Sequence, residues 1–155
     1  MWSRPSNPNP GGSPIFDPRE GQRPERTLLV GYAGRRPPRE VRASLDELGR
    51  LVDTAGAIVV GELVQKRGAA TPATLFSKGK VDEIKGLIAG TNADTIACDD
   101  DLTPAQVRNL EKALDKKVVD RSEVILSIFA KHARTRESRL QVEVAQLEYS
   151  LPRLR

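Results

Sequence analysis

The sequence is poor in cysteine, histidine and aromatic residues, and it has no long apolar run. Its 155 residues include one cysteine, Cys98, and one histidine, His132. One cysteine excludes an internal disulfide and fits a reducing cytosol, while one histidine excludes a catalytic triad or a histidine-based metal site within a single chain. No segment approaches the roughly 18 apolar residues of a membrane span. We therefore expect a soluble, cytoplasmic protein.

Residues 1–26 differ in composition from the rest of the chain. They hold six of the eleven prolines and only three large apolar side chains, Trp2, Ile15 and Phe16. Such a segment cannot bury enough surface to offset the loss of chain entropy, and it lacks the apolar core that a secretory signal requires. We predict a disordered leader over 1–26, an α/β body over 27–119 and a helical arm over 120–155.

Four short apolar runs predict strands that are buried on both faces, at residues 28–32, 57–64, 95–98 and 117–119. Helical patterns lie between these runs, over 38–54, over 81–89 and from 104 onward. The third helix starts at a capping box formed by Thr103 and Gln106. This alternation of strands and helices predicts an α/β fold with a small parallel sheet, flanking helices and right-handed crossovers.

The last quarter of the chain predicts a long amphipathic helix that starts at Asp120. Its apolar residues recur at steps of three, four or seven: Ile125, Phe129, Ala133, Leu140, Val144, Leu147 and Leu151. One helix over 121–151 would be roughly 45 Å long, which is longer than the rest of the domain is wide. We predict an arm whose apolar stripe needs a cover, supplied either by a second molecule or by a missing part of the chain.

A basic belt crosses this arm. Five basic-type side chains occupy nine positions, with only Glu137 against them: Lys131, His132, Arg134, Arg136 and Arg139. Such a belt can neutralise phosphates and release their counterions, or it can be an ordinary solvated helix face. Lys78 and Lys80, just before a predicted helix, leave the same two interpretations open. The net charge of +4 is modest and does not decide between them.

The sequence contains no complete nucleotide-binding motif. Residues 53–56 read DTAG, but they end a predicted helix and not a strand, so we interpret Gly56 as a helix stop. Gly79 and Lys80 are followed by Val81, where a P-loop requires serine or threonine. A guanine-nucleotide site therefore has no sequence support in this chain.

Three carboxylates follow the third predicted strand: Asp99, Asp100 and Asp101. Ligands often bind at this position of an α/β sheet, and three carboxylates could hold Mg²⁺. We favour solvated side chains ahead of the Thr103 cap, because the sequence shows no converging set of oxygen ligands. Cys98, which lies inside an apolar run, is interpreted as inert core.

Four longer stretches carry a resemblance to a known family. They are SLDELGRLVDTAGAIVVGELVQKR (44–67), LFSKGKVDEI (75–84), CDDDLTPAQVRNLEKAL (98–114) and VVDRSEVILSIFAKHARTRESRLQVEVAQLEYSLPRL (118–154). Together they resemble the N-terminal domain of HflX, a family of ribosome-associated GTPases. The resemblance covers about residues 27–155, and IFAKHARTRESRLQVEVAQL is its most specific part.

This resemblance implies a translation factor that binds the large ribosomal subunit and its RNA, and that splits stalled or idle ribosomes, often after heat or antibiotic stress. In that family the domain has an α/β body and a long helical hairpin whose tip approaches the peptidyl transferase centre. GTP and Mg²⁺ bind in a later domain. The resemblance therefore implies no cofactor, no metal site and no catalytic residue in this chain.

The chain departs from the family pattern in two respects. The family continues after LPRL with a glycine-rich loop, the returning helix of the hairpin and a P-loop G domain, whereas this sequence ends at Arg155. We therefore expect a truncated arm, half of a hairpin, that neither binds nor hydrolyses GTP; a fragment, a split reading frame and a natural short relative all stay open. Ser138 stands where the family usually has glycine, which predicts an altered packing or bend of the arm.

Our leading hypothesis is that the chain binds ribosomal RNA through the following side chains: Lys131, His132, Arg134, Arg136, Arg139, Lys78, Lys80, Arg153 and Arg155. Shape and phosphate contacts would dominate, because structured RNA hides its base edges and the few aromatic residues argue against stacking. The alternative is a protein-interaction module that self-associates through the apolar stripe. A third hypothesis, a small-ligand or nucleotide site at the acidic strand end, is the one we expect to fail.

Overall fold

The structure is a computed structural model that describes residues 23–153. Most of the predicted leader lies outside this range, and so do Leu154 and Arg155. Within it, the body begins earlier than residue 27. The carboxylate of Glu25 accepts a hydrogen bond from Thr95 Oγ1 at 2.6 Å and pairs with Lys117 Nζ at 2.7 Å, so this part of the predicted leader belongs to the body.

Four parallel strands form one sheet in the order β2-β1-β3-β4. They are β1 (Arg26–Tyr32), β2 (Ile58–Gln65), β3 (Thr95–Cys98) and β4 (Lys117–Asp120). The predicted α/β class and all four predicted strands are confirmed, with ends that shift by one or two residues. Continuous apolar runs identified β1, β3 and β4 because strands covered on both faces leave no polar side. The expected burial on both faces is wrong for β2, an edge strand in which Ile58 and Val59 are 40% and 42% exposed.

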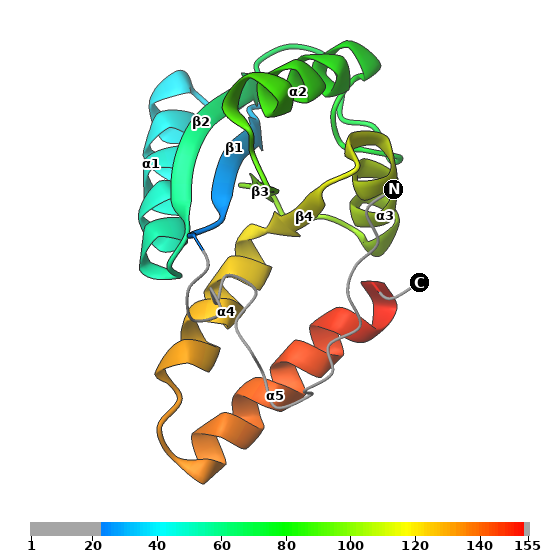
Figure 1. Ribbon diagram of the computed structural model, residues 1–155. Helices are drawn as coiled ribbons and strands as arrows, with labels where there is room; N and C mark the ends of the chain where they lie inside the picture. Colours follow the sequence, from blue (N-terminus) through cyan, green and yellow to red (C-terminus); the bar gives the residue numbers. More distant parts are fainter. Residues whose placement is uncertain (1–22, 154–155) are drawn as a thin grey trace.

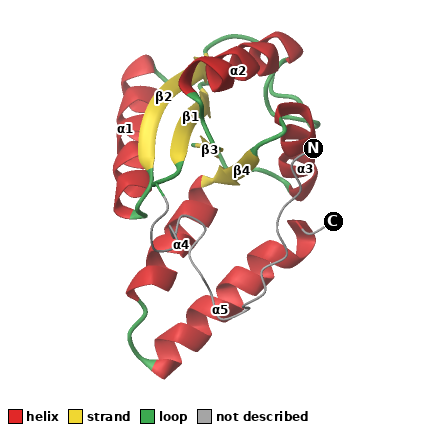
Figure 2. Ribbon diagram, in the orientation of Figure 1, coloured by secondary structure: helices red, strands yellow, loops and turns green. Residues whose placement is uncertain are grey.

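Helices cover both faces of this sheet, as Figures 1 and 2 show. Helices α2 (Lys78–Thr91) and α3 (Pro104–Leu114) pack over Leu28 and Val30 on one face, whereas α1 (Pro38–Thr54) packs over Leu29 on the other. Alternate residues of β1 therefore serve two separate core clusters, as the alternation of side chains along a strand requires. The body is thus a three-layer domain.

Local signals in the sequence account for most helix ends. Thr103 forms the predicted capping box with Gln106, at 3.1 Å and 3.0 Å. Gly56 follows α1 with a φ of +97°, so the DTAG segment is a helix stop, as predicted. Helix α2 begins three residues earlier than predicted. Its C-cap is Asn92, which has a φ of 52°, and not Gly90.

The prediction of one continuous arm is wrong. The arm consists of α4 (Arg121–His132) and α5 (Arg136–Ser150), followed by the short 3-10 helix η1 (Leu151–Arg153). The backbone is extended at Ala133, with φ −70° and ψ 114°, and the chain then turns back toward α3 (Figure 1). Within the described residues this segment is therefore a hairpin whose two legs are α4 and α5.

Two residues explain the break between the legs. Thr135 Oγ1 accepts a hydrogen bond from the backbone N–H of Ser138 at 3.0 Å, and Ser138 Oγ accepts one from the backbone N–H of Thr135 at 3.1 Å. This reciprocal capping box starts a new helix at Arg136, so continuing α4 through Thr135 would forfeit it. Ser138, which we expected to alter the bend of the arm, takes part in the bend directly.

No helix within residues 23–153 is long and apolar enough to cross a membrane.

We predict that Leu48→Ala lowers the free energy of unfolding by about 2–5 kcal/mol, because Leu48 is fully buried between α1 and the sheet. Leu151→Ala is the matched control. Leu151 is 63% exposed, and its truncation should change stability by at most about 0.5 kcal/mol. Equilibrium unfolding in urea measures both values, and equal losses would contradict the described core.

Candidate functional site

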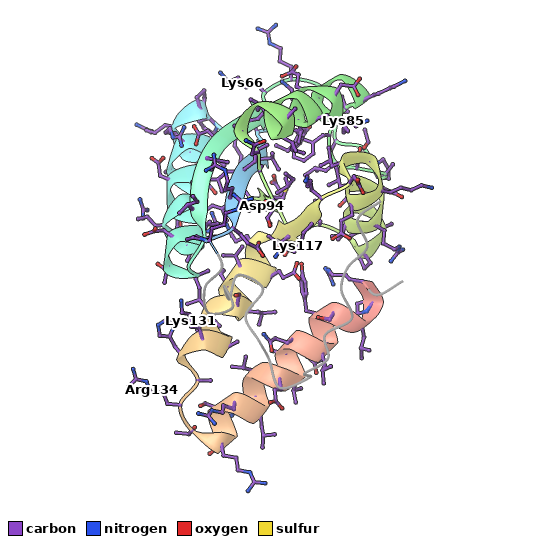
Figure 3. All side chains as sticks on the ribbon, in the orientation of Figure 1. Lys66, Lys85, Asp94, Lys117, Lys131 and Arg134 are labelled. Atoms are coloured by element: carbon purple, nitrogen blue, oxygen red, sulfur yellow. The ribbon has the colours of Figure 1, made fainter. Side chains whose placement is uncertain are left out.

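The basic belt forms one surface at the turn of the hairpin, which we call the tip cluster: Lys131, His132, Arg134, Arg136 and Arg139. All five side chains are exposed. They come from the last turn of α4, the connecting residues and the first turn of α5. Figure 3 shows Lys131 and Arg134 at the end of the hairpin, far from the sheet. Folding thus gathers the predicted belt at the outermost point of the arm.

Two members of the tip cluster help to shape the turn. Nδ1 of His132 lies 2.9 Å from the carbonyl oxygen of Ile128, and Arg139 Nε donates to the carbonyl oxygen of Ala133 at 3.3 Å. Within residues 23–153, no carboxylate forms an ion pair with Lys131, Arg134 or Arg136. These three side chains are therefore the cations of the tip that are available to an external anion.

The carboxyl end of α5 is fastened to the body by a cluster that we call the latch: Asp120, Tyr149 and Arg153. Asp120 lies at the junction of β4 and α4 and is fully buried. Its carboxylate accepts hydrogen bonds from the backbone N–H groups of Leu102 and Glu123, each at 3.0 Å, and from the hydroxyl of Tyr149. Because α5 has no fully buried residue of its own, the latch supplies much of its attachment.

The Tyr149 hydroxyl remains a hydrogen-bond donor in this environment. Burial raises the pKa of Tyr149 far above its ordinary value, and the carboxylates of Glu123 and Asp120 raise it further. Ionising the phenol next to these groups would place two like charges in contact inside the protein. The phenol therefore stays protonated at neutral pH and can donate its hydrogen bond to Asp120.

Arg153 completes the latch from η1. Its guanidinium lies 3.7 Å from the centre of the Tyr149 ring, and it donates to the carbonyl oxygens of Tyr149 at 2.8 Å and Leu102 at 3.0 Å. Arg153 was one of the predicted RNA contacts, but the structure places it in the latch, where its own chain occupies it. Arg155, another predicted contact, lies outside the described residues.

Lys78 and Lys80 are separated from the tip cluster. They lie at the amino end of α2, where Ser77 Oγ accepts a hydrogen bond from the backbone N–H of Lys80 at 3.2 Å. The Lys80 ammonium pairs with Glu83 at 3.2 Å, whereas the Lys78 side chain is exposed. The structure therefore divides the predicted RNA-contacting residues among two surfaces and the latch.

The acidic strand end is occupied by the protein's own side chains. Asp99 is 6% exposed, pairs with the Arg121 guanidinium at 2.6 Å and accepts a hydrogen bond from Ser44 Oγ at 2.6 Å. Our prediction of solvated carboxylates is wrong for Asp99. Burial raises the pKa of Asp100, whose carboxylate accepts a hydrogen bond from the backbone N–H of Tyr32 at 2.9 Å. Within the described residues no group of three potential ligands could hold a metal ion.

This arrangement also bears on the hypothesis of a small-ligand site. The chain leaves β1 toward β2 and leaves β3 toward β4, on opposite sides, and α/β proteins usually bind ligands in the crevice between two such strands. Here the Asp99–Arg121 pair and Arg36, which lies 3.6 Å from Asp100, fill that position. Cys98 beside it is fully buried, and burial raises the pKa of its thiol, as expected for inert core.

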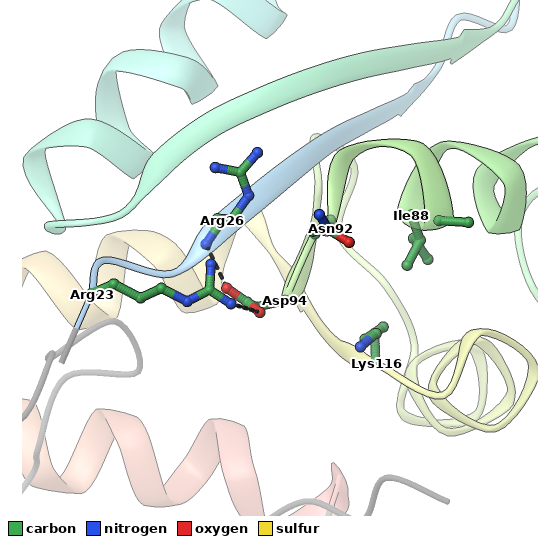
Figure 4. Close-up of a pocket in the computed structure, with 8 residues that line it drawn as sticks. Arg23, Arg26, Ile88, Asn92, Asp94 and Lys116 are labelled. Atoms are coloured by element: carbon green, nitrogen blue, oxygen red, sulfur yellow. Dashed lines mark hydrogen bonds and ion pairs between the residues drawn. The ribbon is translucent and has the colours of Figure 1, made fainter.

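A cavity of about 700 Å³ lies at the opposite edge of the sheet (Figure 4). Two of its three cations have partners: the Arg26 guanidinium donates twice to the carbonyl oxygen of Thr91, at 3.0 Å and 2.8 Å, and Arg23 pairs with Asp94 at 3.1 Å, while Lys116 also lines the cavity. These contacts connect the start of β1 to the end of α2 and to Asp94, at the amino edge of the sheet.

The predicted apolar stripe is divided between the two legs of the hairpin. Phe129 on α4 is 57% exposed, and four apolar residues of α5 and η1 are exposed as well: Leu140, Val144, Leu147 and Leu151. Ile125, in contrast, is partly buried. The stripe is thus exposed as predicted, but neither the structure nor the comparisons below support self-association.

The chain matches two consecutive family profiles. The profile described as GTP-binding GTPase N-terminal matches residues 42–130, which is more than half of the chain, and the profile of the GTP-binding GTPase Middle Region matches residues 132–155. GTPase HflX of Lacrimispora saccharolytica is 51% identical over 130 residues, and GTPase HflX of Caldanaerobacter subterraneus subsp. tengcongensis is 46% identical over 130 residues. The chain belongs to the HflX family.

The matched region is a limited part of the HflX relatives. Each alignment covers 84% of this chain but only 30% of the relative, so the chain spans about a third of their length. It corresponds to their N-terminal region and the start of their middle region. The boundary between the two HflX profiles falls at the end of α4, with α4 up to residue 130 in the first and α5 in the second.

Solved structures share the HflX fold of this chain. A GTP-binding protein from the hyperthermophilic archaeon Sulfolobus solfataricus, in complex with GDP, is 25% identical and has a TM-score of 0.60 over 83% of this chain and 38% of its own. A mutation variant of SsGBP is 24% identical, with a TM-score of 0.66 over 83% of this chain and 40% of its own. The latter likeness concerns the fold alone.

Sequence reasoning missed the latch and the break at the tip. The break had a local signal, because Thr135 is a good N-cap residue, but serine at the third helical position is a weaker partner than the usual glutamate or glutamine. The latch had no local signal. Asp120 and Tyr149 are 29 positions apart, and only the turn of the hairpin brings them together.

We predict that Tyr149→Phe lowers the free energy of unfolding by about 1.5–3 kcal/mol, because it removes one hydrogen bond to a buried carboxylate. It should also speed amide hydrogen exchange in α5. Tyr32→Phe is the control, since it removes an exposed hydroxyl whose acceptor is the neutral carbonyl of Gly68. That variant should lose at most about 1 kcal/mol and leave α5 exchange unchanged; the same exchange pattern in both variants would argue against the latch.

Proposed function

We propose that this chain is the N-terminal ribosome-binding part of an HflX-type translation factor, and that it docks on the RNA of the large ribosomal subunit through the tip cluster. One observation carries the proposal. Folding concentrates the basic belt at the end of a two-legged hairpin and leaves Lys131, Arg134 and Arg136 exposed and without an ion-pair partner among the described residues. Phosphate groups are the natural partners of such cations.

The shape of the site supports RNA over a small anion. The tip is a projecting turn, and small-ligand sites are concave. A projecting basic turn can enter a groove between RNA helices and make several phosphate contacts at once, which suits recognition by shape and backbone. The latch supports this role, because it holds the second leg against the body and so limits the directions in which the tip can point.

The activity of the longer HflX proteins belongs to this proposal and not to this chain alone. The relatives carry the name GTPase, and the chain spans 30% of their length. We propose that GTP and Mg²⁺ act in the remainder of such a protein, and that splitting and rescue of ribosomes under stress require both parts. The role of this chain is then non-catalytic docking in the cytoplasm.

We predict that a variant with Lys131→Glu, Arg134→Glu and Arg136→Glu binds large ribosomal subunits at least about tenfold more weakly at moderate salt. The slope of log affinity against log salt should fall in magnitude by roughly two to three, about one for each lost phosphate contact. Cosedimentation of the 155-residue chain with purified subunits over a salt series measures both quantities.

The matched control carries the same charge change on helices away from the tip: Arg50→Glu, Lys85→Glu and Lys112→Glu. All three positions are exposed. If this control loses as much affinity as the tip variant, binding depends on net charge alone. The tip cluster would then not be the docking site.

A further inference from the structure

A second group of exposed cations lies at the carboxyl edge of the sheet. We call it the edge cluster: Arg35, Lys66, Arg67 and Lys78, all of which are exposed. The loop after β1, the loop after β2 and the start of α2 contribute its members. Figure 3 shows Lys66 at the end of the molecule opposite to Lys131 and Arg134, so the edge cluster and the tip cluster are separate surfaces.

One buried residue, through its backbone and its side chain, joins the three segments of the edge cluster. Gln65 is 2% exposed, and its backbone carbonyl oxygen accepts a hydrogen bond from the backbone N–H of Ala33 at 2.9 Å. Its side-chain Oε1 accepts one from the backbone N–H of Ser77 at 2.8 Å, and its Nε2 donates to the carbonyl oxygen of Arg67 at 3.0 Å. Each cation therefore lies within two residues, or about 7 Å of chain, of a hydrogen bond to Gln65.

A hydrogen bond between Tyr32 and Gly68 also connects the end of β1 to the loop after β2. The Tyr32 hydroxyl donates to the carbonyl oxygen of Gly68 at 2.7 Å. Gly68 has a φ of +92°, and a Cβ at that position would lie 3.3 Å from Nε2 of Gln65. The positive φ thus favours glycine at this position, and a Cβ there would be in tight contact with Gln65. The loop that carries Lys66 and Arg67 is consequently built into the fold.

The described residues do not neutralise the edge cluster. Among residues 23–153, no carboxylate forms an ion pair with Arg35, Lys66, Arg67 or Lys78. Three carboxylates of the same edge and of α2 already have cationic partners of their own, in the pairs Asp99–Arg121, Asp100–Arg36 and Glu83–Lys80, and Asp101 accepts a hydrogen bond from Ser122. Internal pairing thus leaves a net positive surface over the ends of β1 and β2.

We propose that the edge cluster is a second RNA-contacting surface, which binds phosphates of the same RNA partner as the tip cluster; this inference rests on the proposed function. Four exposed cations, on two loops and the start of α2, suit an extended polyanion, whereas a small anion requires donors that converge in a cavity. The cavity of Figure 4 lies at the other edge of the sheet. Two cationic surfaces at opposite ends of one folded unit make it a bivalent binder, so each surface strengthens the attachment made by the other.

The test compares three triple variants of the 155-residue chain, each with the same change in charge. The edge variant carries Lys66→Glu, Arg67→Glu and Lys78→Glu, and it is measured beside the tip variant and the Arg50, Lys85 and Lys112 control. Cosedimentation with large ribosomal subunits over a salt series is repeated with protein-free RNA extracted from the same subunits. We expect the edge variant to bind both targets at least about tenfold more weakly than the control, with a salt slope reduced by roughly two to three.

Each result separates the inference from the proposed function. An edge variant that binds like the control, beside a weakened tip variant, overturns the inference and leaves the tip in place. A weakened edge variant beside a tip variant that binds like the control overturns the tip as the docking site. If the edge variant binds intact subunits more weakly but extracted RNA normally, the partner of this surface is a ribosomal protein, and the assignment to RNA is wrong.

Discussion

The buried carboxylate of Asp120 is the interaction on which the arrangement of the molecule depends. It ends β4, caps α4 and holds α5, since it accepts hydrogen bonds from the backbone of Leu102 and Glu123 and from the hydroxyl of Tyr149. A buried carboxylate is costly unless its oxygens are satisfied, and here three donors satisfy it. The hairpin is therefore attached to the sheet at both ends through one fully buried carboxyl group.

At the carboxyl edge of the sheet, Asp99 and Asp100 have cationic partners within the protein, whereas the cations of the tip and edge clusters are exposed. Arg121 joins α4 to β3 through Asp99 and reaches α1 through Glu47, at 3.1 Å, so acidic side chains at the carboxyl edge serve as structural partners. The net charge of +4 therefore understates how basic the two ends of the molecule are. A polyanionic partner meets the local field of the tip and edge clusters, and not the average of the whole surface.

The hairpin also joins two regions of the HflX family. Helix α4, up to residue 130, lies in the part matched by the N-terminal profile, and α5 lies in the part matched by the middle-region profile. The apolar face of α5, with Leu140, Val144 and Leu147 each about half exposed, thus belongs to a region that the longer relatives extend. The latch connects the two regions physically, because Tyr149 and Arg153 of the second bind Asp120 and Leu102 of the first.

Local patterns in the sequence determined the α/β class, the four strands and most helix ends. The buried runs of β1 and β3, the Thr103 capping box and the stop at Gly56 each depend on residues that are near neighbours in the chain. The same patterns located the basic belt, because the belt occupies a few consecutive turns. Hydrophobic period and capping chemistry are short-range properties, so they can be read without a tertiary structure.

Only the tertiary structure decided how the arm turns back, what Asp99 binds and where each cation points. Periodicity continued through Ala133, and it could not show that Thr135 and Ser138 begin a second helix or that Tyr149 meets Asp120. Arg153 looked like a free cation until the fold placed it over the ring of Tyr149. These outcomes depend on contacts between residues far apart in sequence, whose energies arise only after the chain has closed the loops between them.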